Sequence, residues 1–177
     1  MTTKKNILAI CGSASRESAN LSILRRVAQL GEFHFEMEIM DDLSLLPHFQ
    51  TELTEKDVPE QILQLRESIQ TSDAVVICSP EYVFSIPSGL KNLIEWCVST
   101  TVFTDKPVGL ITASAHGAKG HAELQLLMKT LQAQFTEDST LLIPGVKGKV
   151  NKQDGIIASQ TESELKHFVE SLKKMVL

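Results

Sequence analysis

Short apolar segments alternate with helix-like patterns along the whole of this sequence. Five segments read as strands, and several are continuously apolar, as strands covered on both faces are: residues 6–11, 34–40, 74–78, 107–113 and 139–143. Strands that alternate with helices predict right-handed parallel crossovers. The chain is therefore expected to form a doubly wound α/β fold, in which a five-stranded parallel sheet carries helices on both faces.

The helices between these strands are predicted from apolar residues that recur at intervals of three and four. Four such stripes begin at Leu21, Val58, Leu90 and Leu124. A fifth helix ends the chain, and its start is predicted at Thr161, because Thr161 and Glu164 have the spacing of a capping box.

The length and charge of the chain indicate its domain number and argue against some classes of partner. A chain of 177 residues with 42% hydrophobic residues and no linker predicts one domain, 1–177. A net charge of -5 without a Lys/Arg cluster argues against nucleic acid and anionic membranes as partners. No apolar run reaches the roughly 18 residues of a spanning helix, and no signal-peptide profile opens the chain, so a cytoplasmic location is expected.

Cysteine and histidine spacing gives no sign of a metal or disulfide framework. Cys11, Cys78 and Cys97 are odd in number, far apart and set among apolar residues, which favours buried free thiols. The five histidines show neither HxH nor HExxH spacing. No metal site is therefore expected.

The loop after the first strand, GSASRESAN (residues 12–20), is rich in hydrogen-bond donors and precedes a helix. Backbone N–H groups at a helix start form a ready anion site, and a phosphate there can use Ser13, Ser15, Ser18 and Asn20. The spacing is neither GxGxxG nor GxxxxGK[ST], so the corresponding dinucleotide and triphosphate modes are disfavoured. The alternative is a turn that only caps a helix.

Two further loops are expected at the same edge, because ligands of a doubly wound sheet bind beyond the carboxyl ends of its strands. In SPEYVFSIPSG (residues 79–89), Pro80 and Pro87 keep the chain extended, which leaves the amides of Glu81 and Tyr82 free to meet a flat heterocycle. Tyr82 or Val83 would wall its face. The loop ASAHGAKGH (residues 113–121) permits close backbone approach. Each loop alone can also be an ordinary surface connection.

The stretches GSASRESAN, SPEYVFSIPSGLKNLIEW and KPVGLITASAHGAKG together resemble the NADPH-dependent FMN reductases of flavodoxin-like fold, which include chromate, quinone and azo-dye reductases. The resemblance covers nearly the whole chain. It implies FMN as cofactor and NADPH or NADH as electron donor. The FMN-binding residues implied are Ser13, Ser15, Arg16, Ser18 and Asn20 for the phosphate, Pro80, Glu81, Tyr82 and Val83 for the isoalloxazine, and Ser114, His116 and Gly117 in the third loop.

The sequence departs from the family pattern at three places. The family often has Arg at the position of Ser15, whereas here Arg16 follows one position later. Val83 stands where Asn is common after PEY, and SIPSG stands where SIPG is usual. These departures bear on flavin affinity and on which acceptors fit.

The function predicted from the resemblance is two-electron transfer from nicotinamide through FMN to a quinone, an azo compound, a metal oxyanion or free flavin. The flavin carries the chemistry, so no catalytic acid or base is nominated, and Glu81 is expected to be structural. The main alternative is a flavodoxin-type electron carrier, although such carriers are usually far more acidic and lack the PEY loop. A receiver-type signalling domain would need acidic residues where Cys11 and Gly12 end the first strand.

The partners implied are a small-molecule acceptor and further copies of the chain, as a homodimer or homotetramer. Trp96 lies off its helix stripe, so it is expected either at a subunit contact or partly exposed. His116 is expected either beside the site or in solvent, His121 is expected in solvent, and Lys119 would attract the extra phosphate of NADPH.

Overall fold

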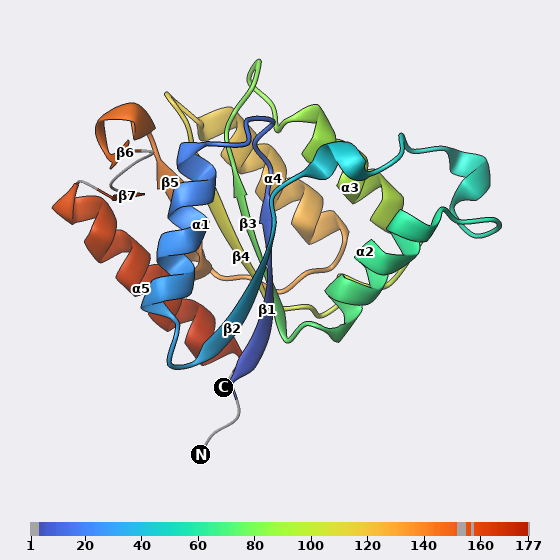
Figure 1. Cartoon of the computed structure of the whole chain (residues 1–177), viewed down its shortest axis with the longest axis horizontal. Helices are drawn as coiled ribbons and strands as arrows, with labels where there is room; N and C mark the ends of the chain where they lie inside the picture. Colours follow the sequence, from blue (N-terminus) through green and yellow to red (C-terminus); the bar gives the residue numbers. More distant parts are fainter. Residues whose placement is uncertain (1–3, 152–154, 157, 177) are drawn as a thin grey trace.

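Five parallel strands lie in the order β2-β1-β3-β4-β5, with helices on both faces of the sheet (Figure 1). The computed structural model describes residues 4–151, 155–156 and 158–176. Each strand agrees with its predicted range to within one residue at either end, which confirms the flavodoxin-like α/β fold. The strands are β1 (Lys5–Cys11), β2 (Phe35–Met40), β3 (Ala74–Ser79), β4 (Val108–Ala113) and β5 (Thr140–Ile143).

The helices form two layers that bury the two faces of the sheet in separate clusters. In Figure 1, α1 and α5 lie together on one face and α2, α3 and α4 lie on the other. Their bounds are α1 (Ala19–Leu30), α2 (Glu60–Thr71), α3 (Ser88–Cys97), α4 (Ala118–Thr130) and α5 (Ser159–Val176). Short additional elements are the 3-10 turns η1 (Leu43–Leu45), η2 (Thr51–Leu53), η3 (Glu137–Ser139) and η4 (Val146–Gly148), and an antiparallel pair, β6 (Val150–Asn151) with β7 (Gly155–Ile156).

The start of the last helix differs from the prediction. α5 begins at Ser159, so Thr161 lies inside its first turn and does not cap it. Thr161 is fully buried and continues the inward face that includes Leu165 and Phe168. Among the described residues its hydroxyl has no hydrogen-bond partner. The capping-box spacing was therefore coincidental, because burial fixes where this side chain points.

Trp96 is neither exposed nor available for a subunit contact, contrary to both expectations. Its side chain is fully buried, and its indole N–H donates to the carbonyl of Pro47 at 2.8 Å. Its ring meets the Phe49 ring edge-on, with 5.3 Å between the centroids. Trp96 lies off the stripe of α3 because it packs against the segment between β2 and α2 instead of the sheet.

Replacing Trp96 by phenylalanine should remove this indole hydrogen bond while keeping an aromatic ring in the site. We expect a loss of about 1 kcal/mol and a melting temperature about 2–4 °C lower, measured by circular dichroism. The Pro47 carbonyl also accepts from the Asn92 side-chain amide at 3.0 Å. An unchanged melting temperature would therefore mean that Asn92 alone satisfies this carbonyl.

Candidate functional site

The loops after β1, β3 and β4 meet at the carboxyl edge of the sheet, as the fold class predicts. The Ser114 hydroxyl of the third loop donates to the carbonyl of Glu81 in the second at 3.4 Å. The Tyr82 hydroxyl lies 3.5 Å from the Ser13 hydroxyl of the first loop, a long hydrogen bond. These contacts join the three loops into one surface.

The first loop ends in a helix cap. The Ser18 hydroxyl accepts from the N–H of Leu21 at 3.1 Å and so caps α1. The Ser13 hydroxyl accepts from the N–H of Ser15 at 3.2 Å, while Ser15 and Arg16 are exposed. The simpler alternative of a capping turn is therefore correct for Ser18. It does not remove the anion site, because a capping hydroxyl can still donate its own proton.

The side chain of Asn20 points into the protein. Its amide nitrogen donates to the carbonyl of Ala113 at 3.3 Å, and its oxygen accepts from the Cys78 thiol at 3.3 Å. Asn20 thus ties the start of α1 to the ends of β3 and β4. Any phosphate contact of Asn20 would come from its backbone N–H, and the predicted role of the residue stays a prediction.

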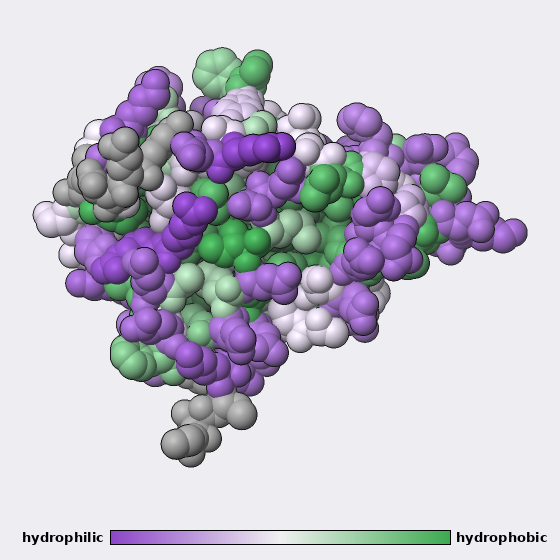
Figure 2. Space-filling model, in the orientation of Figure 1, coloured by the Kyte–Doolittle hydropathy of each residue, from purple (hydrophilic) through white to green (hydrophobic). Residues whose placement is uncertain are grey.

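The second loop contains a two-residue hairpin that the sequence analysis did not predict. Tyr82 and Ser85 exchange both backbone hydrogen bonds, at 2.9 and 3.0 Å. The prediction that the Tyr82 amide is free was therefore wrong. Val83 and Phe84 form the tip with φ of 51° and 60°, and their side chains are 93% and 74% exposed. In Figure 2, apolar green atoms project at the top of the view, where Figure 1 places the loop after β3.

Glu81 and α4 hold each other in place. The Glu81 carboxylate accepts from the N–H of Gly120 at 2.8 Å, in the first turn of a helix whose N-cap is Gly117, with φ of 91°. That hydrogen bond is the main cause that lowers the pKa of Glu81; burial opposes it, and the N–H groups of Gly117 and Lys119 add to it. The structural role expected for Glu81 is confirmed.

Glu123, on α4, makes the reciprocal contact with the second loop and was missed by the sequence analysis. Its carboxylate accepts from the Ser85 hydroxyl at 2.6 Å and from the N–H of Ile86 at 3.1 Å, and it lies 3.6 Å from the Lys91 ammonium. Burial raises the pKa of Glu123, but these donors and the lysine charge outweigh it, so the pKa is lowered. Glu81 and Glu123 together clamp the loop to α4.

His121 is not a solvated loop residue. It lies in the first turn of α4, half-buried, with its ring Nδ1 2.9 Å from the Thr112 hydroxyl. Burial lowers its pKa, so the ring is neutral at neutral pH. His116 and Lys119 are exposed, and their predicted roles stay predictions.

A cleft of about 660 Å³ opens beside the joined loops. Three of the twelve predicted FMN residues line it, namely Ser13, Arg16 and Tyr82. The other lining residues come from the β1–α1 loop, the β2–α2 segment, the end of the β3–α3 loop and α3: Gly12, Ala14, Asp41, Asp42, Leu43, Ser44, Leu46, His48, Phe49, Pro87, Ser88, Gly89, Lys91, Asn92 and Glu95. The sequence analysis missed the β2–α2 wall, although Asp41 directly follows β2, whose carboxyl end lies at the same edge.

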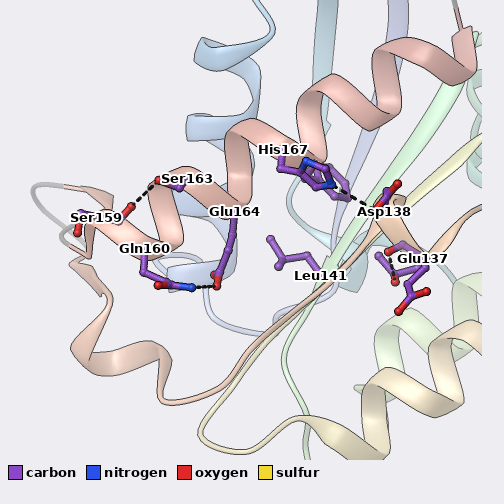
Figure 3. Close-up of a pocket in the computed structure, with 10 residues that line it drawn as sticks. Glu137, Asp138, Leu141, Ser159, Gln160, Ser163, Glu164 and His167 are labelled. Carbon is purple, nitrogen blue, oxygen red and sulfur yellow. Dashed lines mark hydrogen bonds and ion pairs between the residues drawn. The ribbon is translucent and has the colours of Figure 1, made fainter.

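A second hollow, of about 560 Å³, lies between β5 and α5 (Figure 3). Its polar side chains pair with one another: His167 lies 3.2 Å from Asp138, and the Gln160 amide donates to Glu164 at 2.9 Å. Asp138 belongs to η3, which precedes β5, so this hollow lies at the amino end of that strand. Ligands of this fold bind at the carboxyl ends, and we therefore take the first cleft as the candidate site.

Three further observations concern the cysteines, possible metal ligands and possible membrane-spanning helices. All three cysteines are buried and free, as predicted, and burial raises the pKa of each thiol, in Cys97 to about 12. Within the described ranges, no three His, Cys, Asp or Glu side chains are grouped to hold a metal ion. None of the helices in those ranges is both long and apolar enough to cross a membrane.

Comparisons with known proteins agree with this architecture. The profile of the family described as NADPH-dependent FMN reductase matches residues 5–148. The NADH:(hydroxy)cinnamate reductase subunit CrdA of Vibrio ruber is 30% identical over 90% of this chain and 81% of its own length, and the quinone reductase of Escherichia coli K12 is 26% identical over 90% and 88%. The flavoenzyme NAD(P)H:(acceptor) oxidoreductase FerB of Paracoccus denitrificans superposes with a TM-score of 0.79 at 23% identity, covering 97% of each chain. These relatives give no support to the electron-carrier alternative. The chain belongs to the NADPH-dependent FMN reductase family.

Proposed function

We propose that this chain, acting as a single domain, binds FMN at the joined loops and reduces a small-molecule acceptor with electrons from NADPH or NADH. The observation that carries the proposal is the meeting of the loops after β1, β3 and β4 at the carboxyl edge, where Tyr82 contacts Ser13 and Ser114 contacts Glu81. This edge is where doubly wound folds bind their ligands. The activity of the Escherichia coli quinone reductase and the description of the family as NADPH-dependent FMN reductases support the same reaction.

The residues at the first loop fit a phosphate. The N-terminus of α1 has unsatisfied N–H groups and a partial positive charge, and the Ser18 hydroxyl lies at that end. Ser15 and Arg16 are exposed beside it. A Cβ on Gly12 would lie 2.8 Å from the Ser79 hydroxyl, so the backbone passes close to β3 at this point. Ser13, Ser15, Arg16, Ser18 and the backbone of Asn20 would hold the phosphate.

The flavin ring would lie along the second and third loops, against Pro80, Glu81, Tyr82, Val83, Ser114, His116 and Gly117. When bound, FMN accepts two electrons as hydride from nicotinamide and passes them on, which is chemistry that the protein itself lacks. The side chains orient the ring and exclude water. Glu81 is ionised at neutral pH because its pKa is lowered, so it holds α4 and does not supply a proton.

We further propose that the protein is a homodimer or homotetramer in the cytoplasm. Exposed apolar side chains at Val83 and Phe84 support association, and three buried free thiols suit a reducing compartment. Light scattering of the purified protein measures the oligomeric state directly.

The proposed function is tested by anaerobic reduction of the FMN-loaded protein. NADPH or NADH alone should bleach the flavin absorbance within seconds, and a quinone should restore it. An electron carrier would stay oxidised until a separate reductase is added. Protein that takes up no FMN in a titration would contradict the proposal altogether.

Ser18→Ala tests the phosphate site. We expect FMN affinity to fall about tenfold, because a hydrogen bond to a charged group is lost, and stability to fall by about 1 kcal/mol with the helix cap. The matched control is Thr136→Ala, which removes the cap of η3, where the Thr136 hydroxyl accepts from the N–H of Ser139 at 3.3 Å. The control should lose stability and keep its FMN affinity. Equal FMN affinity in both variants would remove Ser18 from the site.

A further inference from the structure

Two of the three cysteines are neighbours across the sheet, at the base of the first loop. Cys11, the last residue of β1, and Cys78, in β3, are register partners on adjacent parallel strands. Both side chains belong to the core cluster that α1 and α5 cover, so they point to the same side of the sheet. Adjacent strands lie about 4.8 Å apart. This spacing is within the range of Cα separations that a disulfide bridges, about 4.4–6.8 Å.

Each of these two thiols contacts a residue at the start of α1. The Cys78 thiol donates to the side-chain oxygen of Asn20 at 3.3 Å, and the Cys11 sulfur lies 3.8 Å from the Ser18 hydroxyl. Asn20 and Ser18 are themselves buried, and both belong to the residues proposed to hold the FMN phosphate. A chemical change at the two sulfurs would therefore act directly on the phosphate loop.

A reagent in solvent reaches this pair of thiols only when the first loop opens. Cys11 and Cys78 are 1% and 0% exposed, and burial raises the pKa of each thiol, so both are protonated in the closed protein. The loop leaves β1 after Cys11 and returns to contact it at Ser18, and residues 14–17 between them are exposed. Segments with few buried contacts open most readily. A phosphate held by this loop would keep it closed, so bound FMN should protect the pair.

We propose that Cys11 and Cys78 form an oxidation site, which hydrogen peroxide converts to a disulfide in the protein without FMN, and that this disulfide weakens FMN binding. Only the second part rests on the proposed function. One thiol loses its proton and attacks a peroxide oxygen; an S–O bond forms, the O–O bond breaks, and water leaves. The other thiol attacks the resulting sulfenic acid, the S–S bond forms, and a second water leaves. The two sulfurs give up two electrons, which reduce one peroxide to two waters.

The disulfide would remove both thiol contacts at the start of α1. The buried side-chain oxygen of Asn20 would lose its Cys78 donor, and Ser18 would lose its contact with Cys11. A disulfide needs Cβ atoms about 3.8 Å apart, which is less than the spacing of adjacent strands, so β1 and β3 must be drawn together below the loop. Such strain makes a disulfide easy to reduce, and the oxidation is therefore reversible.

The test treats the whole chain with hydrogen peroxide, with and without FMN. Without FMN, the number of free thiols should fall from three to one, and mass spectrometry of a digest should find Cys11 linked to Cys78. The FMN affinity, measured by flavin fluorescence titration, should fall about tenfold and should return after dithiothreitol. Because the coupling between two sites is reciprocal, saturating FMN should slow the loss of thiols, also about tenfold.

Cys11→Ala and Cys97→Ala are the matched variants, since each removes one buried thiol. Cys97 lies in α3 and belongs to the core cluster on the opposite face of the sheet, so its replacement keeps the pair intact. Peroxide should lower the FMN affinity of Cys97→Ala as it does in the wild type, and it should leave that of Cys11→Ala unchanged. Cys11→Ser, which keeps a hydroxyl near Ser18, replaces Cys11→Ala if the alanine variant does not fold.

Any of three results would overturn the inference. If all three thiols stayed free, or ended as sulfinic acids, the pair would not be a disulfide-forming site. If peroxide weakened FMN binding equally in Cys11→Ala and Cys97→Ala, the damage would lie elsewhere. If the disulfide formed and FMN affinity stayed the same, the pair would not act on the phosphate loop. A failure of the proposed function is distinguishable, because reduced protein would then take up no FMN, whereas the thiol count and the mass of the linked peptide do not depend on FMN.

Discussion

Glu123→Ala is expected to lower the melting temperature by about 5–10 °C and to weaken FMN binding about tenfold, although Glu123 lines neither the cleft nor the predicted FMN site. The carboxylate accepts from the Ser85 hydroxyl and the Ile86 N–H, immediately after the strained hairpin tip. Its removal leaves both donors and the Lys91 charge without this partner, at a cost of about 2–3 kcal/mol. The loop that would carry the flavin ring then loses one of its two attachments to α4.

The matched control for Glu123 is Glu162→Ala. Glu162, on α5, pairs with Arg26 on α1, and its side chain is 23% exposed, against 27% for Glu123. Both variants lose a partly buried carboxylate, but only Glu123 contacts the second loop. The melting temperature should therefore fall in both variants. The FMN affinity, measured by flavin fluorescence titration, should fall in Glu123→Ala alone. If FMN affinity fell equally in the two, the effect would come from general destabilisation and the positioning role would be wrong.

The contribution of Glu123 should also depend on pH. Because its pKa is lowered in the folded protein, its stabilisation is fully present above the unfolded pKa of about 4.3 and is lost as the pH falls through the folded value. The gap in melting temperature between wild type and Glu123→Ala should be constant from pH 7 to pH 5 and should shrink below about pH 4. A gap that persists unchanged below pH 3 would show that charge is not its source.

The strands of the sheet follow from local patterns, and the meeting of its loops follows from the fold class. β3 and β4 are buried along their full length, so their continuous apolar runs reflect cover on both faces. Once the alternation predicts parallel strands, their carboxyl ends must share an edge. That the loops after β1, β3 and β4 are neighbours follows from the strand order β2-β1-β3-β4-β5, which the fold class supplies and the alternation does not. That step needs no knowledge of side-chain contacts.

The features missed by sequence reasoning depend on contacts between distant residues. In the sequence Asn20 looks like a free donor in a polar loop. In the structure its side chain points inward, because it forms hydrogen bonds with the Ala113 carbonyl and the Cys78 thiol. Trp96 lies outside the apolar stripe of its helix, because that stripe marks only the helix surface that faces the sheet. Trp96 packs instead against the segment containing Pro47. The β2–α2 wall has no long periodic pattern, because its only regular elements are the short 3-10 turns η1 and η2. Asn92 and Trp96 of α3 hold it in place.

The hairpin in the second loop was missed for a different reason: its tip has the wrong residues for its geometry. A two-residue loop with φ above zero at both positions is a type I′ turn, for which Asn-Gly is the preferred pair. Here Val83 and Phe84 occupy those positions, and a β-branched residue in this region is a strong outlier. The strain persists because both flanks are fixed, by Glu81 before the tip and by Glu123 after it.

The double variant Val83→Asn/Phe84→Gly should therefore be more stable than the natural sequence. Relief of left-handed strain is worth about 1–2 kcal/mol per residue, or about 2–4 kcal/mol for the two residues, and the added flexibility of glycine in the unfolded chain offsets about 0.5–1 kcal/mol of this. The net gain is about 1–3 kcal/mol, or a melting temperature about 3–10 °C higher, measured by differential scanning calorimetry at low protein concentration.

The control for this variant is Phe33→Asn, which removes a large exposed side chain at a position without positive φ. It should leave the melting temperature unchanged within about 2 °C, because isolated surface changes are worth less than about 0.5 kcal/mol. A gain in the double variant alone isolates backbone strain as the cause. A loss of stability there would mean that Val83 and Phe84 make contacts beyond the single chain, since within it both side chains are largely exposed to solvent.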